Sequence, residues 1–263
     1  MNKPLLMGVV NTTPDSFSDG GSFGSPMAAC DQIEKLLEDG ADIIDLGAES
    51  TRPGAESLTS EKEWQRLEPV FNEIHKRHLR ATFSIDSHKE KTVLNAIEAG
   101  ASFINNVDGV FAQSFFDKLP SKEGLSYIAM HRNADAKTMQ NAPLKGAEAV
   151  SHVERFFGEA SQSLQAFGFD KSHIWLDPGI GFGKDDSANL RLLAETHQWT
   201  KNYQVTLGIS RKSFLGRLLG IDPPKERDSA SKTLELGLWL LGAQMIRTHD
   251  VKPLKNMVEL ITG

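Results

Sequence analysis

Short apolar runs alternate with longer amphipathic segments along this chain. The apolar runs have the length of buried parallel strands and lie at residues 5–10, 43–46, 82–85, 103–104, 127–130, 174–176, 205–209 and 245–246. Between them, apolar residues recur at helical spacing in segments such as residues 27–39, 61–76, 89–99, 149–167 and 229–241. The pattern therefore predicts a repeated strand–helix unit.

The number of repeats selects the architecture. Eight strand candidates alternate with helices in a chain of 263 residues, and a typical (β/α)8 barrel has ~250 residues. Glycine precedes several strands in the same manner, as at Gly40, Gly100 and Gly242, and no proline- or serine-rich linker divides the chain. The sequence predicts one α/β domain over residues 1–263, a single TIM barrel with its ligand site at the C-terminal ends of the strands.

Composition narrows the class of protein. A net charge of -6 argues against a general nucleic-acid binder, so any anionic ligand must be met by cations gathered locally. No apolar stretch approaches the roughly 18 residues of a membrane helix, and the first residues lack a signal-peptide core. The single cysteine, Cys30, cannot form an internal disulfide. We expect a cytoplasmic protein without nucleic-acid or membrane partners.

Polar side chains follow every apolar run. In a barrel of this kind the C-terminal ends of all strands form one face, where ligands bind. Polar residues at all eight ends therefore predict a ligand site. In chain order they lie in residues 11–21, 45–54, 84–87, 105–106, 130–131, 177, 210–212 and 247–250.

The stretch WLDPGIGFGK, residues 175–184, is the most informative of these. Asp177 comes where the chain leaves an apolar strand, and Pro178 forbids continuation of the strand ladder. The glycines let the backbone turn tightly and approach a ligand. The alternative is a turn whose aspartate merely caps the next helix. The polar ends of the other strands favour a ligand-binding role for Asp177.

Two acids and an amide in the predicted mouth suit a particular kind of ligand. Asp86 and Asp177 can accept N–H groups from a flat, polar-edged heterocycle, and Asn105 can also donate to its carbonyl. Hydrogen bonding to the barrel backbone is the alternative, and it stays open for Asn105. His131 and His249 do not lie at a spacing from these acids that predicts a transition-metal site.

Cations form a second group at the strand ends. Lys212, Arg247 and His249 are accompanied by Lys184 and Arg52 on nearby loops. Arginine and lysine are the expected partners of phosphate and carboxylate oxygens. Lys212 is the strongest candidate because it ends an apolar strand, where a charge needs a partner. Lys184, taken alone, is predicted to be a solvated lysine at the start of a helix.

Taken together, these stretches resemble the dihydropteroate synthase family nearly from end to end. The resemblance is carried by GVVNTTPDSFSDGG (residues 8–21), DLGAESTRPG (45–54), SIDS (84–87), INNV (104–107), MH (130–131), LDPGIGFGK (176–184), SRKSFLG (210–216) and IRTHDV (246–251). It implies a transferase of folate biosynthesis that condenses 6-hydroxymethyl-7,8-dihydropterin pyrophosphate with p-aminobenzoate, giving 7,8-dihydropteroate and pyrophosphate. It also implies Mg2+ as cofactor, a homodimer, a sulfonamide target, and a dissociative mechanism.

The same resemblance assigns roles to individual residues. Asp86, Asp177 and Lys212 are implied as catalytic, and Asn11 as a metal ligand. The pterin is expected among Asp86, Asn105, Met130, Asp177, Lys212 and Arg247, and the pyrophosphate at Asn11, Arg247 and His249. The p-aminobenzoate pocket is expected at Thr13, Pro14, Phe17, Ser50, Thr51, Arg52, Pro53, Phe182 and Ser213.

Two positions depart from the family pattern. Asn106 stands where the family usually has aspartate, so a carboxylate is expected to be missing beside the pterin. Ile180 stands where the glycine-rich loop often has an aromatic residue. Asn106 keeps open the alternative of a pterin-binding paralogue that does not catalyse. A further alternative is the pterin domain of a corrinoid-linked methyltransferase, against which stand residues 210–212 and the first two loops.

Overall fold

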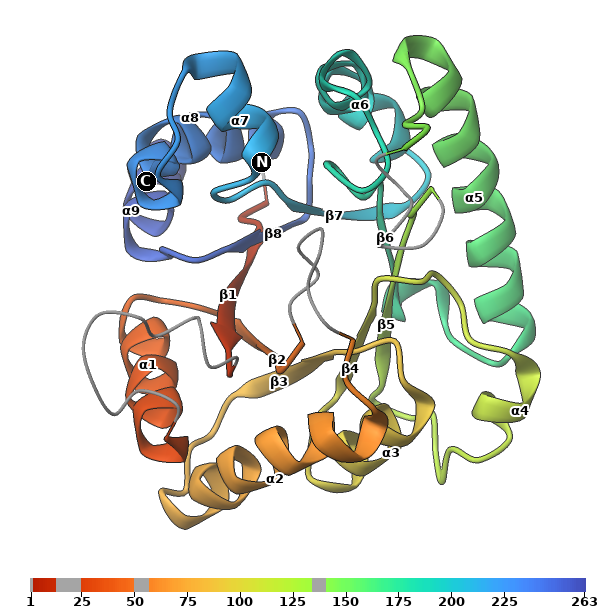
Figure 1. Ribbon diagram of the computed structural model, residues 1–263, viewed down its shortest axis with the longest axis vertical. Helices are drawn as coiled ribbons and strands as arrows, with labels where there is room; N and C mark the ends of the chain where they lie inside the picture. Colours follow the sequence, from red (N-terminus) through yellow and green to blue (C-terminus); the bar gives the residue numbers. More distant parts are fainter. Residues whose placement is uncertain (1, 13–24, 50–56, 134–140) are drawn as a thin grey trace.

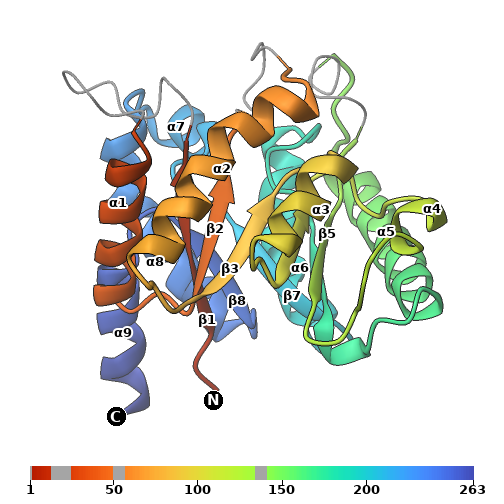
Figure 2. The same ribbon diagram turned by 90° about the horizontal axis from the view of Figure 1, so that it is seen from below.

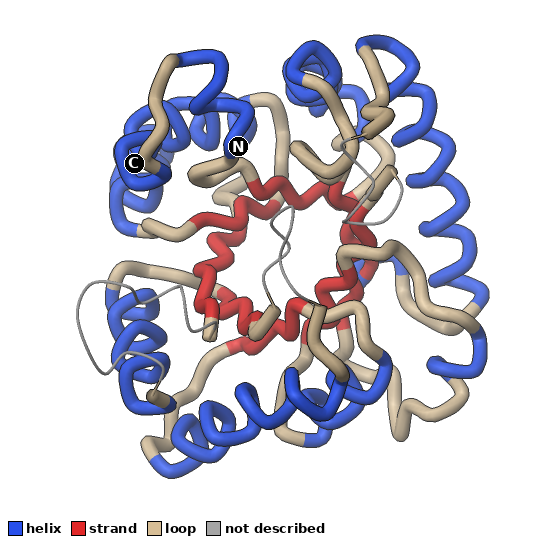
Figure 3. Tube along the Cα trace, in the orientation of Figure 1, coloured by secondary structure: helices blue, strands red, loops and turns tan. Residues whose placement is uncertain are grey.

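Eight parallel strands close into a ring. The computed structural model describes residues 2–12, 25–49, 57–133 and 141–263, and in this part of the chain each strand pairs with the next while β8 returns to pair with β1 (Figure 3). The strands are β1 (Leu5–Asn11), β2 (Ile43–Gly47), β3 (Thr82–Asp86), β4 (Phe103–Asn106), β5 (Ser126–Met130), β6 (Ile174–Asp177), β7 (Gln204–Gly208) and β8 (Met245–Thr248). The predicted (β/α)8 barrel is confirmed.

Helices surround this ring (Figure 1). They are α1 (Pro26–Glu38), α2 (Ser60–Lys76), α3 (Glu90–Glu98), α4 (Gln113–Phe116), α5 (Gly146–Ala166), α6 (Asp186–Trp199), α7 (Ser213–Leu219), α8 (Asp228–Leu240) and α9 (Lys252–Thr262). Local sequence sets several of their starts. Ser25 caps α1 and Thr59 caps α2, each accepting from a backbone N–H of the first turn.

Apolar side chains fill two layers. One cluster lies inside the ring and contains Met7, Ile43, Ile128, Trp175 and Met245, all nearly inaccessible to solvent. A larger cluster lies between the strands and the surrounding helices. Strands β2, β5 and β6 are buried at every position. Because both faces of the strands are covered, they read in the sequence as unbroken apolar runs rather than alternating ones.

The strands extend further than the apolar runs predicted. Ladder pairing continues through Asn11, opposite Gly47, and through Asp86, opposite Asn105. Asp177 likewise pairs with Met130. These polar residues are therefore strand residues held by backbone hydrogen bonds, not the first residues of loops. Both chain termini lie at one end of the barrel, from which β1 begins (Figure 2), so the polar strand ends gather at the other.

Candidate active site

The pairing register decides which polar side chains enter the barrel. Side chains alternate between the two faces of a strand, and residues paired across neighbouring strands share a face. The inner-face positions closest to the C-terminal ends carry Asn11, Asp86, Asn105, Met130, Asp177 and Arg247. Asp45 shares this inner face one step deeper, because Gly47 is the last inward residue of β2. The sequence predicted all of these except Asp45 as site residues.

Arg247 joins three strands. Its Nε donates to Oδ2 of Asp45 over 2.6 Å, and its Nη2 donates to Oδ2 of Asp86 over 2.7 Å. The same oxygen of Asp45 accepts from Nδ2 of Asn105 over 3.0 Å. Asp45 is fully buried, whereas Asp86 and Arg247 are half-buried. A guanidinium is thus held between two carboxylates at the bottom of the mouth, one of them sealed off from water.

Burial changes the protonation of the acid that faces the mouth. It raises the pKa of the Asp86 carboxyl to about 7, against the effect of Arg247, and the Asp45 carboxylate adds to the rise. Although burial acts to lower it, the pKa of Arg247 lies above its ordinary value because of Asp45 and Asp86. Asp86 therefore exchanges its proton near neutral pH while the guanidinium stays charged.

Asn11 lies beside this group. A β-carbon added to Gly47 would stand 3.5 Å from Oδ1 of Asn11 and 3.6 Å from Oδ2 of Asp86. The two side chains therefore approach from either side of the glycine. The structure brings together Asn11, Asp86, Asn105 and Arg247, as the sequence predicted.

Asp177 does not cap the helix that follows it. Its Oδ1 accepts from the backbone N–H of Gly179 over 2.6 Å, whereas α6 is capped by Asp185, which accepts from the N–H of Ala188. Burial raises the pKa of Asp177, while Lys212 and the bond from Gly179 act in the opposite direction. The helix-capping alternative is wrong, and the carboxyl stays at the mouth.

The loop after Asp177 packs tightly against the backbone that follows β5. Gly179 has a φ of +64°, and a β-carbon there would stand 1.9 Å from the carbonyl oxygen of His131. No side chain fits in that space, and the left-handed backbone independently favours glycine. The glycine pattern seen in the sequence thus serves close packing between two loops at the mouth.

Lys184 departs from its prediction as a solvated lysine. Its side chain is buried, and its ammonium donates to the carbonyl oxygens of Gly179 (2.9 Å), Phe182 (3.0 Å) and His131 (3.3 Å). Burial lowers the pKa of Lys184 to about 7. The prediction was wrong because α6 begins beyond Asp185, which leaves Lys184 inside the loop, where three carbonyls converge.

Lys212 extends into the mouth from the loop between β7 and α7, rather than ending the strand as the sequence predicted, because β7 stops at Gly208. Its ammonium donates to the carbonyl oxygen of Ile180 and lies 4.8 Å from the centroid of the Phe182 ring. Burial lowers the pKa of Lys212 to about 8, while Asp177 acts to raise it and Arg247 to lower it further. Lys212 is therefore within electrostatic reach of both the acids and the guanidinium, as predicted.

His249 follows β8 and is fixed by Ser210. The Ser210 hydroxyl lies 3.0 Å from Nδ1 of His249 and accepts from its backbone N–H over 3.3 Å. Burial, together with the nearby cations Arg211 and Arg247, lowers the pKa of His249 to about 3. The imidazole is therefore neutral at physiological pH unless an anion is added beside it.

Ser213 opens α7 and is exposed, with its hydroxyl accepting from Arg217 over 3.3 Å. The remaining predicted p-aminobenzoate residues lie outside the described part of the chain. They are Thr13, Pro14, Phe17, Ser50, Thr51, Arg52 and Pro53. Of that predicted pocket, the structure describes Phe182 and Ser213, and of these Phe182 is in contact with Lys212.

Asn106 does not line the mouth. It is buried on the outer face of β4, where Nδ2 donates to the Tyr127 hydroxyl over 2.9 Å and Oδ1 accepts from the Asp108 N–H over 2.9 Å. Tyr127 belongs to the apolar layer between strands and helices. The expectation that Asn106 leaves a carboxylate missing beside the ligand is therefore wrong, because alternation along β4 sends Asn105 inward and Asn106 outward.

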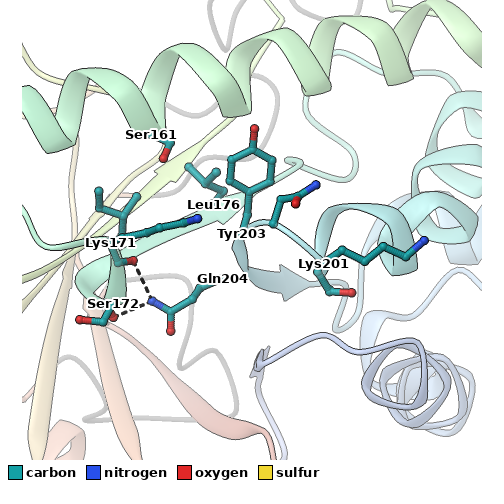
Figure 4. A pocket seen from close by; sticks show the side chains of 10 residues that line it. Ser161, Lys171, Ser172, Leu176, Lys201, Tyr203 and Gln204 are labelled. Atoms are coloured by element: carbon teal, nitrogen blue, oxygen red, sulfur yellow. Dashed lines mark hydrogen bonds between the residues drawn. The ribbon is translucent and has the colours of Figure 1, made fainter.

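Other parts of the described structure hold none of the predicted site residues in a second pocket or metal cluster. Among the described residues, no cluster of three or more His, Cys, Asp or Glu side chains could hold a metal ion, and no helix in the same part of the chain is long and apolar enough to cross a membrane. A cavity of about 360 Å³ opens at the N-terminal ends of β6 and β7, lined in part by Lys171, Lys201, Tyr203 and Gln204 (Figure 4). None of the predicted site residues lines it.

Comparisons with known proteins bear on this arrangement. Residues 7–249 match the family described as pterin binding enzyme. The dihydropteroate synthase of Escherichia coli (strain K12) is 38% identical over 255 residues, which span 96% of this chain and 88% of that protein. The Yersinia pestis dihydropteroate synthase structure with a sulfonamide drug complex has a TM-score of 0.89 at 34% identity, covering 99% of this chain and 94% of that one. The Xanthomonas albilineans dihydropteroate synthase in complex with 7,8-dihydropteroate has a TM-score of 0.86 at 31% identity, covering 99% and 93%.

Proposed function

The chain belongs to the pterin-binding enzyme family and, within it, to the dihydropteroate synthases, and from this premise we propose how its barrel mouth carries the reaction. The enzyme is a transferase that joins the dihydropterin methylene carbon to the amine of p-aminobenzoate and releases pyrophosphate. The observation that carries the residue assignment is that Asp86, Asn105, Asp177 and Arg247 enter one mouth from four strands. We propose that residues 1–263 form a single pterin-binding barrel domain.

The pterin ring lies between the acids. Asp86 and Asp177 accept the N–H groups of its amidine-like edge, and Asn105 completes the in-plane hydrogen bonds. Met130, which is buried opposite Asp177, offers an apolar surface to the ring. The desolvated carboxyls suit this role because hydrogen bonds to an ionised acceptor are strengthened where water is excluded.

The pyrophosphate lies at the ends of β1 and β8. Arg247 and His249 bind its oxygens, and Asn11 would hold a Mg2+ ion through its amide oxygen. A magnesium ion of this kind is held by few protein ligands because it keeps waters and takes phosphate oxygens from the substrate. When bound, the ion supplies positive charge to the leaving group.

The p-aminobenzoate lies on the far side of the glycine-rich loop. Phe182 and Ser213 form the described part of its pocket, with Lys212 between that pocket and the pterin. The rest of the proposed pocket rests on the sequence alone and consists of Thr13, Pro14, Phe17, Ser50, Thr51, Arg52 and Pro53.

The mechanism we propose is dissociative. The bond between the methylene carbon and the pyrophosphate oxygen breaks first, and its electron pair leaves with the pyrophosphate. The amine nitrogen of p-aminobenzoate then attacks the pterin-methyl cation and releases its proton to solvent. Asp86 and Asp177 stabilise the positive charge that spreads through the ring, while Arg247 and Lys212 stabilise the opposite charge on the departing group.

The same proposal includes a cytoplasmic homodimer. The single cysteine, Cys30, is buried and free, which suits a reducing compartment. Exposed leucines on α7 and at the end of α8, Leu218, Leu219, Leu240 and Leu241, offer apolar surface to a second copy. The non-catalytic alternative loses its basis because Asn106 lies outside the mouth.

Release of pyrophosphate tests the proposal. Purified protein is assayed with Mg2+ and dihydropterin pyrophosphate, with and without p-aminobenzoate. We expect release that depends on p-aminobenzoate and a fall of about 100-fold in turnover for Asp86→Ala and Lys212→Ala, as when one charge-stabilising group is removed from an active site. Lys201→Ala, which removes an exposed lysine at the opposite end of the barrel, is the matched control and is expected to keep full turnover. Wild-type rates for Lys212→Ala would contradict the assigned role.

A further inference from the structure

Asp45 is a buried acid to which no step of the reaction assigns a task. It lies in the middle of the apolar strand β2, two positions before the strand ends at Gly47, and it is fully inaccessible to solvent. Yet one of its oxygens accepts from both Arg247 (2.6 Å) and Asn105 (3.0 Å). Asp45 therefore contacts two residues assigned to pterin binding.

The contact with Arg247 limits where the guanidinium can lie. Arg247 donates Nε to Asp45 and Nη2 to Asp86. A guanidinium is planar and its donors point in fixed directions, so the bond at Nε fixes the plane in which the outer nitrogens reach the mouth. Without Asp45, the nearest acid to the Arg247 guanidinium would be Asp86. The guanidinium would then occupy the Asp86 carboxylate that the pterin needs.

The contact with Asn105 limits which end of the amide a ligand meets. Nδ2 of Asn105 donates a hydrogen bond to Asp45. A carboxylate can accept from the amide nitrogen but cannot donate to the amide oxygen. The amide oxygen therefore points away from Asp45. This orientation turns the amide oxygen, an acceptor, toward the N–H groups along the edge of a heterocycle.

We propose that Asp45 is a positioning residue for pterin recognition, which anchors Arg247 beside Asp86 and turns the Asn105 amide so that its oxygen faces the ligand. The proposal rests on the function proposed above. Asp45 does not touch the substrate; it acts through two residues that do. A carboxylate is required because an amide oxygen in its place could still accept from both Arg247 and Asn105 but would carry no charge to anchor the guanidinium.

Binding of dihydropterin pyrophosphate, measured by calorimetry without p-aminobenzoate, tests this role. We expect Asp45→Asn to weaken binding about 10- to 100-fold, since a buried charged partner is lost. In an Arg247→Gln background the same change should cost about threefold or less, because the Arg247 part of the effect is already gone. An equal cost in both backgrounds would show that Asp45 does not act through Arg247 and would overturn the proposal.

Two further readouts separate positioning from mere stability. Asp45→Asn removes a negative charge beside Asp86, so the acid limb of pterin binding should move to lower pH; a purely structural defect would weaken binding without moving the limb. Asp39→Asn removes an acid that pairs with Lys35 at the C-terminal end of α1 and should leave binding unchanged.

Folding does not confound the test. If Asp45→Asn alone fails to fold, the double variant with Arg247→Gln, which removes both charges of the Asp45–Arg247 pair, is compared with Arg247→Gln, and a difference above tenfold would overturn the proposal. Wild-type protein that binds no pterin would instead contradict the proposed function.

Discussion

The side-chain amide of Asn106 donates a 2.9 Å hydrogen bond to the hydroxyl of Tyr127, 21 positions later in the chain. That hydroxyl in turn donates to the carbonyl of Gly109 over 3.0 Å and accepts from the N–H of Phe111 over 3.2 Å. Burial raises the pKa of Tyr127, so it stays a neutral donor. The position that departs most clearly from the family pattern thus belongs to a satisfied buried network behind β4.

Asn106→Asp is expected to lower stability without raising activity. A carboxylate cannot donate to Tyr127, so either the hydroxyl turns away from Gly109 or the acid is buried with a missing bond, which costs about 1–3 kcal/mol. Urea unfolding measures the loss of stability, and pyrophosphate release measures turnover, which should stay within about threefold of wild type. A large gain in turnover would place Asn106 back in the mouth.

Gly179→Ala is expected to abolish the packing of the mouth. The added carbon would stand 1.9 Å from the carbonyl of His131 at a φ of +64°, so one of the two loops must move. We expect a loss of several kcal/mol, as for other clashes in packed sites, seen as a lower thermal midpoint and loss of turnover. Gly237→Ala is the matched control. That glycine lies within α8, where the added carbon would meet no heavy atom within 4 Å, and it should gain about 0.5–1 kcal/mol.

Lys184→Met is expected to loosen the glycine-rich loop. The substitution keeps the apolar length of the side chain but leaves the carbonyls of Gly179, Phe182 and His131 without their shared donor. Unsatisfied buried acceptors cost about 1–3 kcal/mol. Hydrogen exchange of amides in residues 179–184 should quicken, and KM for both substrates should rise. Lys171→Met, at an exposed lysine of the opposite end, should change neither quantity.

The pH dependence of kcat/KM is expected to be bell-shaped and narrow. Turnover needs Asp86 ionised, and its pKa of about 7 makes kcat/KM rise as pH increases through that value. It also needs Lys212 charged, and its pKa of about 8 makes kcat/KM fall as pH rises further. Lys212→Arg should move the basic limb to higher pH, because arginine stays protonated. A basic limb that does not move would assign it to another group.

The sequence predicted the barrel well because buried parallel strands leave an unbroken apolar signature. The runs at β1 and β6, for example, are followed at once by Asn11 and Asp177, and the geometry of the fold brings such ends to one face. Asp45 was missed as a site residue although its signal was present. It is an acid in the interior of an apolar strand, and a charge in that position needs a partner.

Lys184 and Asn106 could not be placed from the sequence. Lys184 is buried because the carbonyls of His131 and Gly179 converge on it, and the path of those two loops is a tertiary property that no local pattern encodes. Asn106 follows Asn105 at the end of a short strand, where a shift of one residue exchanges the inner and outer faces. The hydrogen bond to Tyr127, on β5, holds Asn106 on the outer face.

The pair of Asp45 and Arg247 spans 202 positions of the chain, and this distance has a consequence for how the protein is made. During synthesis on a ribosome, β8 is the last of the eight strands to emerge. Until it arrives, the two inward acids Asp45 and Asp86 have no Arg247 to neutralise them and hold their shells of water. A growing chain therefore cannot exclude water from the barrel interior before β8 is present. Nascent chains that stop short of β8 should stay open and sensitive to proteases, and ring closure should coincide with delivery of the charge that prepares the site.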